Sequence, residues 1–208
     1  MASTVAGVGR VSVRNLYYPG TNARDAGMAV GDFGKPLPPK VPAYDPAVEA
    51  VDIPRCTTVA IMGEGGVEPP IDLMQQVYEL LDDNREVNFL NFVTKPSFVP
   101  VDIRATVVPY INRSKADAIT SSTQMVTDWL SPEGFGQVPG GATDKTWASD
   151  DRVRLYEAVD FLNRGAATWY VEDVELKIAS DPIGAFDAVD LMLPGVFPIP
   201  VLGTITLS

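Results

Sequence analysis

The residues of this 208-residue sequence that could most readily do chemistry are four carboxylate pairs: Asp82 with Asp83, Asp150 with Asp151, Glu172 with Asp173, and Asp187 with Asp190. Two carboxylates on opposite sides of a sugar could hydrolyse a glycoside, and a carboxylate cluster could bind calcium. However, nothing else in the sequence indicates a sugar site, and no D-x-[DN]-x-[DN]-G calcium loop is present. Acids at helix ends and turns are usually solvated. We therefore assign the pairs no catalytic or metal-binding role.

The sequence also lacks the side chains of nucleophilic catalysis at neutral pH. It contains no histidine and one cysteine, Cys56. These counts exclude Ser-His-Asp and Cys-His triads, histidine-bearing zinc sites and an intramolecular disulfide. No general base is recognisable beside Cys56, so a plain thiol is the better interpretation. We expect no enzyme activity, no catalytic, cofactor-binding or metal-binding residue, and no cofactor.

A glycine-rich turn, Gly63-Glu64-Gly65-Gly66, follows a predicted strand and precedes a predicted helix, which is the position of a phosphate-binding loop. It has neither the G-x-x-x-x-G-K-[ST] pattern nor the G-x-G-x-x-G spacing, because Glu68 occupies the place of the third glycine. Pro69 and Pro70 at the helix entry also remove amides that a phosphate would need. The pattern favours a tight turn.

Around this turn, hydrophobic periodicity predicts a strand–helix–strand unit. Thr57–Met62 and Glu86–Val93 are rich in β-branched and apolar residues, which is typical of strands. Between them, residues 71–84 carry apolar side chains at helical spacing, namely Met74, Val77, Tyr78 and Leu81.

A second α/β unit follows Pro96 and Pro100. Residues 101–107 alternate strictly between apolar and polar, Ser114 with Asp117 predicts a helix start, and the helix is expected over 114–131. Ser149 is expected to cap another helix over 149–164, and strands are expected over 168–179 and 201–207. Trp129 and Trp169 are most simply core residues, whereas packing and an interface remain equal alternatives for Trp147.

The N-terminal region differs from this body. Five prolines fall between residues 36 and 46, and only Gly9–Arg14 alternates like a short strand. We therefore expect an α+β fold of two successive small strand–helix–strand units with mixed sheets, preceded by an extended proline-rich arm. The expected boundaries are 1–55 for the arm, 56–98 for a small strand–helix–strand domain, and 99–208 for an α+β domain with two helices and a C-terminal strand.

Charge separates the same regions. Residues 1–56 hold six basic and five acidic residues, whereas residues 57–208 hold ten basic and 22 acidic ones, within a net charge of −11. An acidic body disfavours nucleic acid and anionic lipid as partners. No apolar stretch approaches the ~20 residues that cross a bilayer, so we expect no membrane span, and residues 1–10 do not resemble a secretory signal.

Several segments resemble one family in order and spacing. They are similar to stretches of the baseplate J-like family of contractile phage tails and related injection systems. The segments are Thr94–Val107, Trp129-Leu-Ser-Pro-Glu-Gly-Phe-Gly136, Val171–Leu176, and Leu193-Pro followed by Pro200–Thr206. The resemblance covers about residues 57–208. Family members usually carry a helical wedge-core region ahead of this part, where the present sequence has the proline-rich arm.

The resemblance implies a structural role without catalysis: a wedge component of the tail baseplate, present in several copies in a sixfold assembly around the tail tube. It implies sheath-initiator-like, tube or wedge proteins as partners, and location in the virion tail baseplate after synthesis in the host cytoplasm. The alternative is a non-catalytic soluble binding or adaptor module of a virion or another assembly.

Overall fold

The computed structural model describes residues 1–17, 52–84, 90–136, 151–181, 184–195 and 197–208. These residues form an α+β fold with mixed sheets, as the sequence predicts, divided into two compact units. Unit 1 lies within Met1–Pro96, and unit 2 comprises Ser97–Gln137 and Ser149–Ser208 over their described residues. The division at Pro96 lies two residues before the expected boundary at residue 98.

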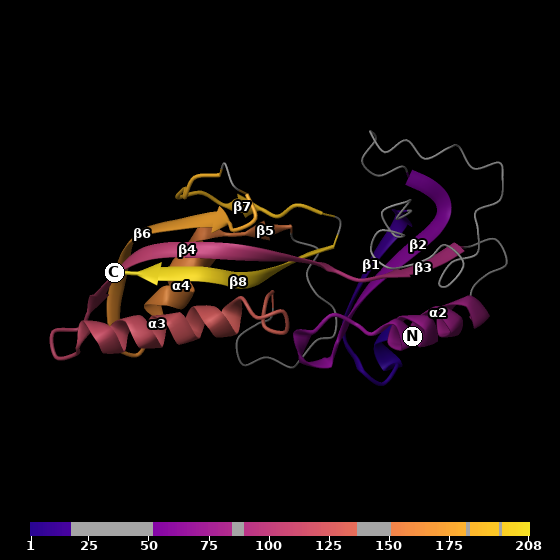
Figure 1. Ribbon diagram of the computed structural model, residues 1–208, viewed down its shortest axis with the longest axis horizontal. Helices are drawn as coiled ribbons and strands as arrows, with labels where there is room; N and C mark the ends of the chain where they lie inside the picture. The colour runs from indigo at the N-terminus through magenta and orange to yellow at the C-terminus, as the bar shows by residue number, and fades with distance from the viewer. Residues whose placement is uncertain (18–51, 85–89, 137–150, 182–183, 196) are drawn as a thin grey trace. The chain divides into compact units, whose positions relative to one another are not determined.

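Unit 1 is a three-stranded sheet with one helix against it (Figure 1). The strand order is β1-β2-β3, with β2 antiparallel to β1 and parallel to β3. The elements are η1 (Ala2–Thr4), β1 (Val8–Tyr17), β2 (Asp52–Gly63), η2 (Glu64–Gly66), α2 (Ile71–Asp83) and β3 (Leu90–Thr94). Helix α2 is the crossover that two parallel neighbouring strands require.

The core of unit 1 lies between the sheet and α2. Val59 and Ile61 of β2 pack with Met74 and Val77 of α2, and all four side chains are buried. Alternate residues of the strand pack there against every third or fourth residue of the helix. These are the two hydrophobic periodicities from which the sequence predicted the strand and the helix.

Strand β1 corrects the expected arm. Val8 and Val11 are buried in the core of unit 1, and β1 pairs with β2 from Val8↔Gly63 to Tyr17↔Asp52. Residues 8–17 and 52–55 are therefore part of the folded sheet, because they pair as strands and Val8 and Val11 fill part of its buried face. The proline-rich residues 36–46 of the expected arm lie outside the described residues.

Unit 2 places two helices against one face of a second sheet (Figure 1). Strand β4 (Ser97–Pro109) is central, antiparallel to β6 (Thr168–Ile178) and parallel to β8 (Pro198–Leu207). The other elements are α3 (Lys115–Trp129), α4 (Leu155–Asn163) and the short paired strands β5 (Arg152–Val153) and β7 (Leu191–Met192).

The alternating pattern of β4 supplies the centre of this core. Val99, Val101, Ile103 and Ala105 are buried against the helices, while the intervening residues point to the other face. The indole ring of Trp129 stacks on Phe161 of α4 with 5.0 Å between centroids. Ser114 caps α3 as the sequence predicts, because its Oγ accepts a hydrogen bond from the Asp117 amide at 3.0 Å.

Helix α4 begins later than the sequence predicts. The expected cap, Ser149, lies outside the described residues, and residues 152–153 form β5 before the helix starts at Leu155. The cap comes from a distant part of the chain: Asp190 Oδ1 accepts a hydrogen bond from the Leu155 amide at 3.0 Å. A carboxylate at this position satisfies a free amide and also faces the positive end of the helix dipole.

Candidate functional site

The glycine-rich turn joins two parts of unit 1. The Gly63 amide donates to the Val67 carbonyl at 2.9 Å, and the Glu64 amide donates to the Gly7 carbonyl at 3.0 Å. Two amides that a phosphate could use are therefore engaged within the protein. The turn also lies close to β1, because a Cβ on Gly9 would lie 2.5 Å from the Gly63 carbonyl oxygen. These contacts give the glycines a structural function.

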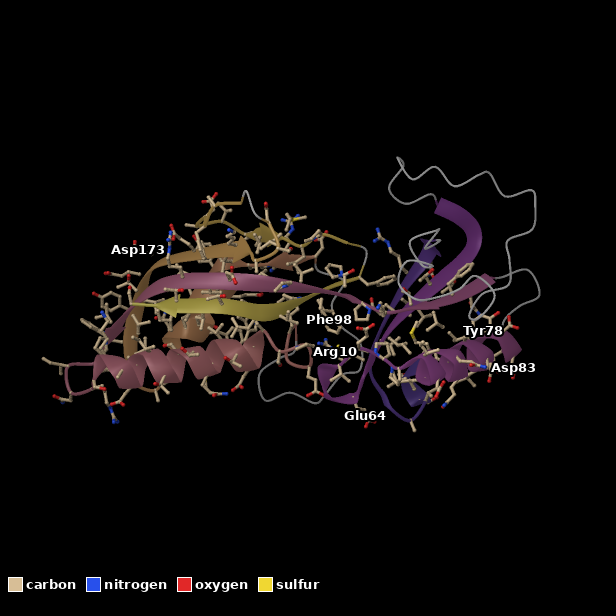
Figure 2. All side chains as sticks on the ribbon, in the orientation of Figure 1. Arg10, Glu64, Tyr78, Asp83, Phe98 and Asp173 are labelled. Atoms are coloured by element: carbon tan, nitrogen blue, oxygen red, sulfur yellow. The ribbon has the colours of Figure 1, made fainter. Side chains whose placement is uncertain are left out.

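The carboxylate pairs are spread over separate elements. Asp82 and Asp83 end α2, and Asp83, labelled in Figure 2, is exposed. Asp187 exchanges backbone hydrogen bonds with Leu176 of β6, whereas Asp190 caps α4. Asp150 lies outside the described residues.

Among the residues that the structure describes, no group of three or more Cys, Asp or Glu side chains is arranged to hold a metal ion. Within the same residues, no helix is long and apolar enough to cross a membrane. The side chain of Cys56 and the whole of Trp147 lie outside the described part of the chain.

The tryptophans divide differently from the sequence prediction. Trp129 is 5% exposed and belongs to the core of unit 2, as expected. Trp169 is 61% exposed, so its predicted place in the core is wrong. It contacts its neighbour Tyr170, 37% exposed, in an edge-to-face arrangement with 5.0 Å between ring centroids. Sequence reasoning missed this aromatic pair as a surface feature.

A β-bulge explains the exposure of Trp169. Along β6, Tyr170 pairs with Val108 and Thr168 pairs with Pro109, so Trp169 is an extra residue opposite one step of β4. Successive residues of a regular strand point to opposite faces, and a bulge re-aims one of them. Thr168 is buried, while Trp169 and Tyr170 are both exposed and in contact.

A second bulge adds acidic residues to the same strand. Glu175 pairs with Arg104 and Glu172 pairs with Thr106, which leaves one extra residue in β6, and Asp173 there has a φ of 51°. Glu172 and Asp173 are exposed, and Figure 2 shows Asp173 on β6 on the side of the sheet away from α3. Trp169, Tyr170, Glu172 and Asp173 thus combine two aromatic and two carboxylate side chains, and we call these four residues the β6 patch.

The carboxylate of Glu175, next along the strand, already has a cationic partner. Arg104 Nε donates to its Oε2 at 2.6 Å, and the same guanidinium lies over the ring of Phe186, 4.6 Å from the centroid. The contacts of Arg104 are thus directed to Glu175 and Phe186, and not to the carboxylates of the β6 patch.

No family model matches this chain, and no curated protein sequence matches it. Among solved structures, it is similar in fold to a chain of the cryo-EM structure of the anti-feeding prophage baseplate, which is 6-fold symmetrised. The similarity has a TM-score of 0.51 over 70% of this chain, at 11% sequence identity. The match spans only 29% of the baseplate chain.

Proposed function

We propose that this chain is a non-catalytic structural subunit of a contractile-tail baseplate, of the baseplate J-like wedge type. The observation that carries the proposal is the similarity in fold to a baseplate chain, which extends over both units because it covers 70% of the sequence. The collinear segments between Thr94 and Thr206 support the same assignment, since their resemblance lies in the sequence and is independent of the fold.

The proposed assembly is symmetric and sixfold, with other baseplate and tail subunits as partners, and the proposed location is the tail baseplate of the virion. Such a role needs no catalytic residue, metal or cofactor. It needs rigid units and exposed surfaces that neighbours recognise. The β6 patch is a candidate for such a surface, because Trp and Tyr are enriched at protein–protein interfaces and this pair is exposed.

Cryo-electron microscopy of tail particles from cells that encode this chain tests the proposal. We expect density for unit 1 and unit 2 in the baseplate, repeated around the tube, and particles without a complete baseplate when the gene is deleted. Normal particles from the deletion strain, with the chain absent from the wild-type baseplate, would contradict the proposal and favour the adaptor alternative.

A further inference from the structure

The β6 patch has the chemistry of a surface that recognises a proline-rich, basic peptide. Exposed aromatic rings offer flat apolar surface on which proline rings pack, and polyproline II segments lose little conformational entropy when they bind there. Trp169 and Tyr170 supply two such rings in contact with one another. Glu172 and Asp173, two to four residues further along β6, add negative charge at one end of the aromatic pair.

The sequence of this chain contains a segment with the complementary chemistry. Residues 35–42 read Lys-Pro-Leu-Pro-Pro-Lys-Val-Pro, so four prolines lie among two lysines and no acid. Lysine is attracted both to carboxylates and to the faces of aromatic rings. The segment is therefore complementary to the β6 patch in composition and in charge.

The dimensions of the two also agree. From Pro36 to Lys40 a polyproline II helix advances about 12 Å, at about 3.1 Å per residue. The β6 patch contains two bulged residues and spans about three steps of β4, which is about 10 Å at about 3.3 Å per residue. A proline at one end of the segment can thus pack on Trp169 while Lys40 reaches the carboxylates at the other end.

Neighbouring apolar residues extend the patch. The Tyr110 amide donates to the Ala167 carbonyl at 3.1 Å, which holds the turn after β4 beside the start of β6. In this turn Tyr110 is 50% and Ile111 is 98% exposed. Apolar surface of this kind adds binding area around the aromatic pair.

We infer that the β6 patch binds residues 35–42 of a second copy of this chain, so that successive copies are linked head to tail. Such a contact is heterologous, and it closes into a ring when the rotation between copies permits. The inference concerns contact between copies and holds whether or not the assembly is a baseplate.

The experiment uses a fluorescein-labelled synthetic peptide of residues 33–44 and fluorescence anisotropy. The receptor is the full chain with residues 35–42 replaced by glycine and serine, so that its own segment cannot compete. We expect saturable binding. Trp169→Ser with Tyr170→Ser should weaken it at least tenfold, whereas Tyr156→Ser, which alters an aromatic residue of α4 that is 84% exposed, should leave it unchanged.

Charge reversal tests the polarity of the contact. Glu172→Lys with Asp173→Lys should weaken binding of the normal peptide, and a peptide with Lys35→Glu and Lys40→Glu should restore it on that receptor. Binding should also weaken as NaCl increases, because salt screens exposed charges. Equal binding by the Trp169→Ser, Tyr170→Ser receptor, or no binding by the unaltered receptor, would overturn the inference.

The oligomeric state of the unaltered chain identifies which copy provides the segment. We expect concentration-dependent association in sedimentation velocity, lost in the Trp169→Ser, Tyr170→Ser variant and retained in Tyr156→Ser. If the peptide binds the receptor but the unaltered chain stays monomeric at every concentration, the segment occupies the patch of its own chain and the proposed link between copies is wrong.

Discussion

The Asp102 carboxylate on β4 accepts a hydrogen bond from the backbone amide of Thr204 on β8, with 2.6 Å between Oδ1 and nitrogen. The parallel register shifts at this point, because Val101 pairs with Leu202 whereas Ile103 pairs with Ile205. Two residues of β8 therefore oppose Asp102 alone. The side chain supplies the acceptor that the interrupted strand pairing leaves open.

Removing this acceptor should destabilise unit 2. We expect Asp102→Ala to cost about 0.5–1.5 kcal/mol of unfolding free energy, the usual net contribution of a hydrogen bond, because Thr204 is exposed and water can reach its amide. Asp102→Asn keeps a side-chain oxygen and should retain most of the stability. Urea denaturation followed by circular dichroism measures both. Equal losses in the two variants would mean that the carboxylate charge, and not the acceptor, stabilises the bulge.

The two described tryptophans should differ sharply in their effect on stability. Trp129 is buried and stacked on Phe161, so Trp129→Ala should cost about 3–5 kcal/mol. Trp169 is 61% exposed, so Trp169→Ser should change the free energy of unfolding by less than about 0.5 kcal/mol. Thermal melting of the purified variants makes the comparison. A large loss in Trp169→Ser would place that ring in the core after all.

The elements that the sequence predicted well are those determined by local pattern. Helix α2, the alternating strand β4 and the Ser114 cap all follow from side chains within one turn or one strand of each other. Hydrophobic periodicity indicates which face of a helix or strand is buried, and it was sufficient to predict these core-facing residues of unit 1 and unit 2.

The elements that it missed depend on distant residues or on register. The start of α4 is set by Asp190, 35 residues after Leu155, and no local pattern identifies that cap. The exposure of Trp169 follows from a bulge in β6 relative to β4. A bulge changes the face of the sheet to which a side chain points, and the amino-acid composition of the strand does not reveal it. A tryptophan at a strand start therefore looked like core.

A buried pair of hydroxyls connects α3 to β6. Ser122 Oγ and Thr168 Oγ1 are 2.7 Å apart, both residues are fully or nearly fully buried, and Ser122 Oγ also donates to the Leu162 carbonyl at 2.8 Å. Ser122→Ala should cost about 1–3 kcal/mol, because it leaves buried polar groups without this partner.

A double-mutant cycle distinguishes this hydrogen bond from simple packing. Thr168→Val should also destabilise unit 2, and the double variant should lose less than the sum of the single losses, since neither hydroxyl is then left unsatisfied by the other. Chemical denaturation gives the four free energies. Strictly additive losses would show that the two hydroxyls do not interact.

Strand β1 should be required for the stability of unit 1. Gly9 lies at a register shift between Val8 and Arg10, and a Cβ there would lie 2.5 Å from the Gly63 carbonyl oxygen. Because backbone atoms would have to move, we expect Gly9→Ala to cost about 1–3 kcal/mol. Hydrogen exchange should rise in amides of β2 and β3 and stay unchanged in β4. Val13→Ala, at a β1 side chain that is 57% exposed, is the matched control and should have little effect. If both variants exchange like the unaltered chain, the close approach of Gly9 to Gly63 contributes little to the stability of unit 1.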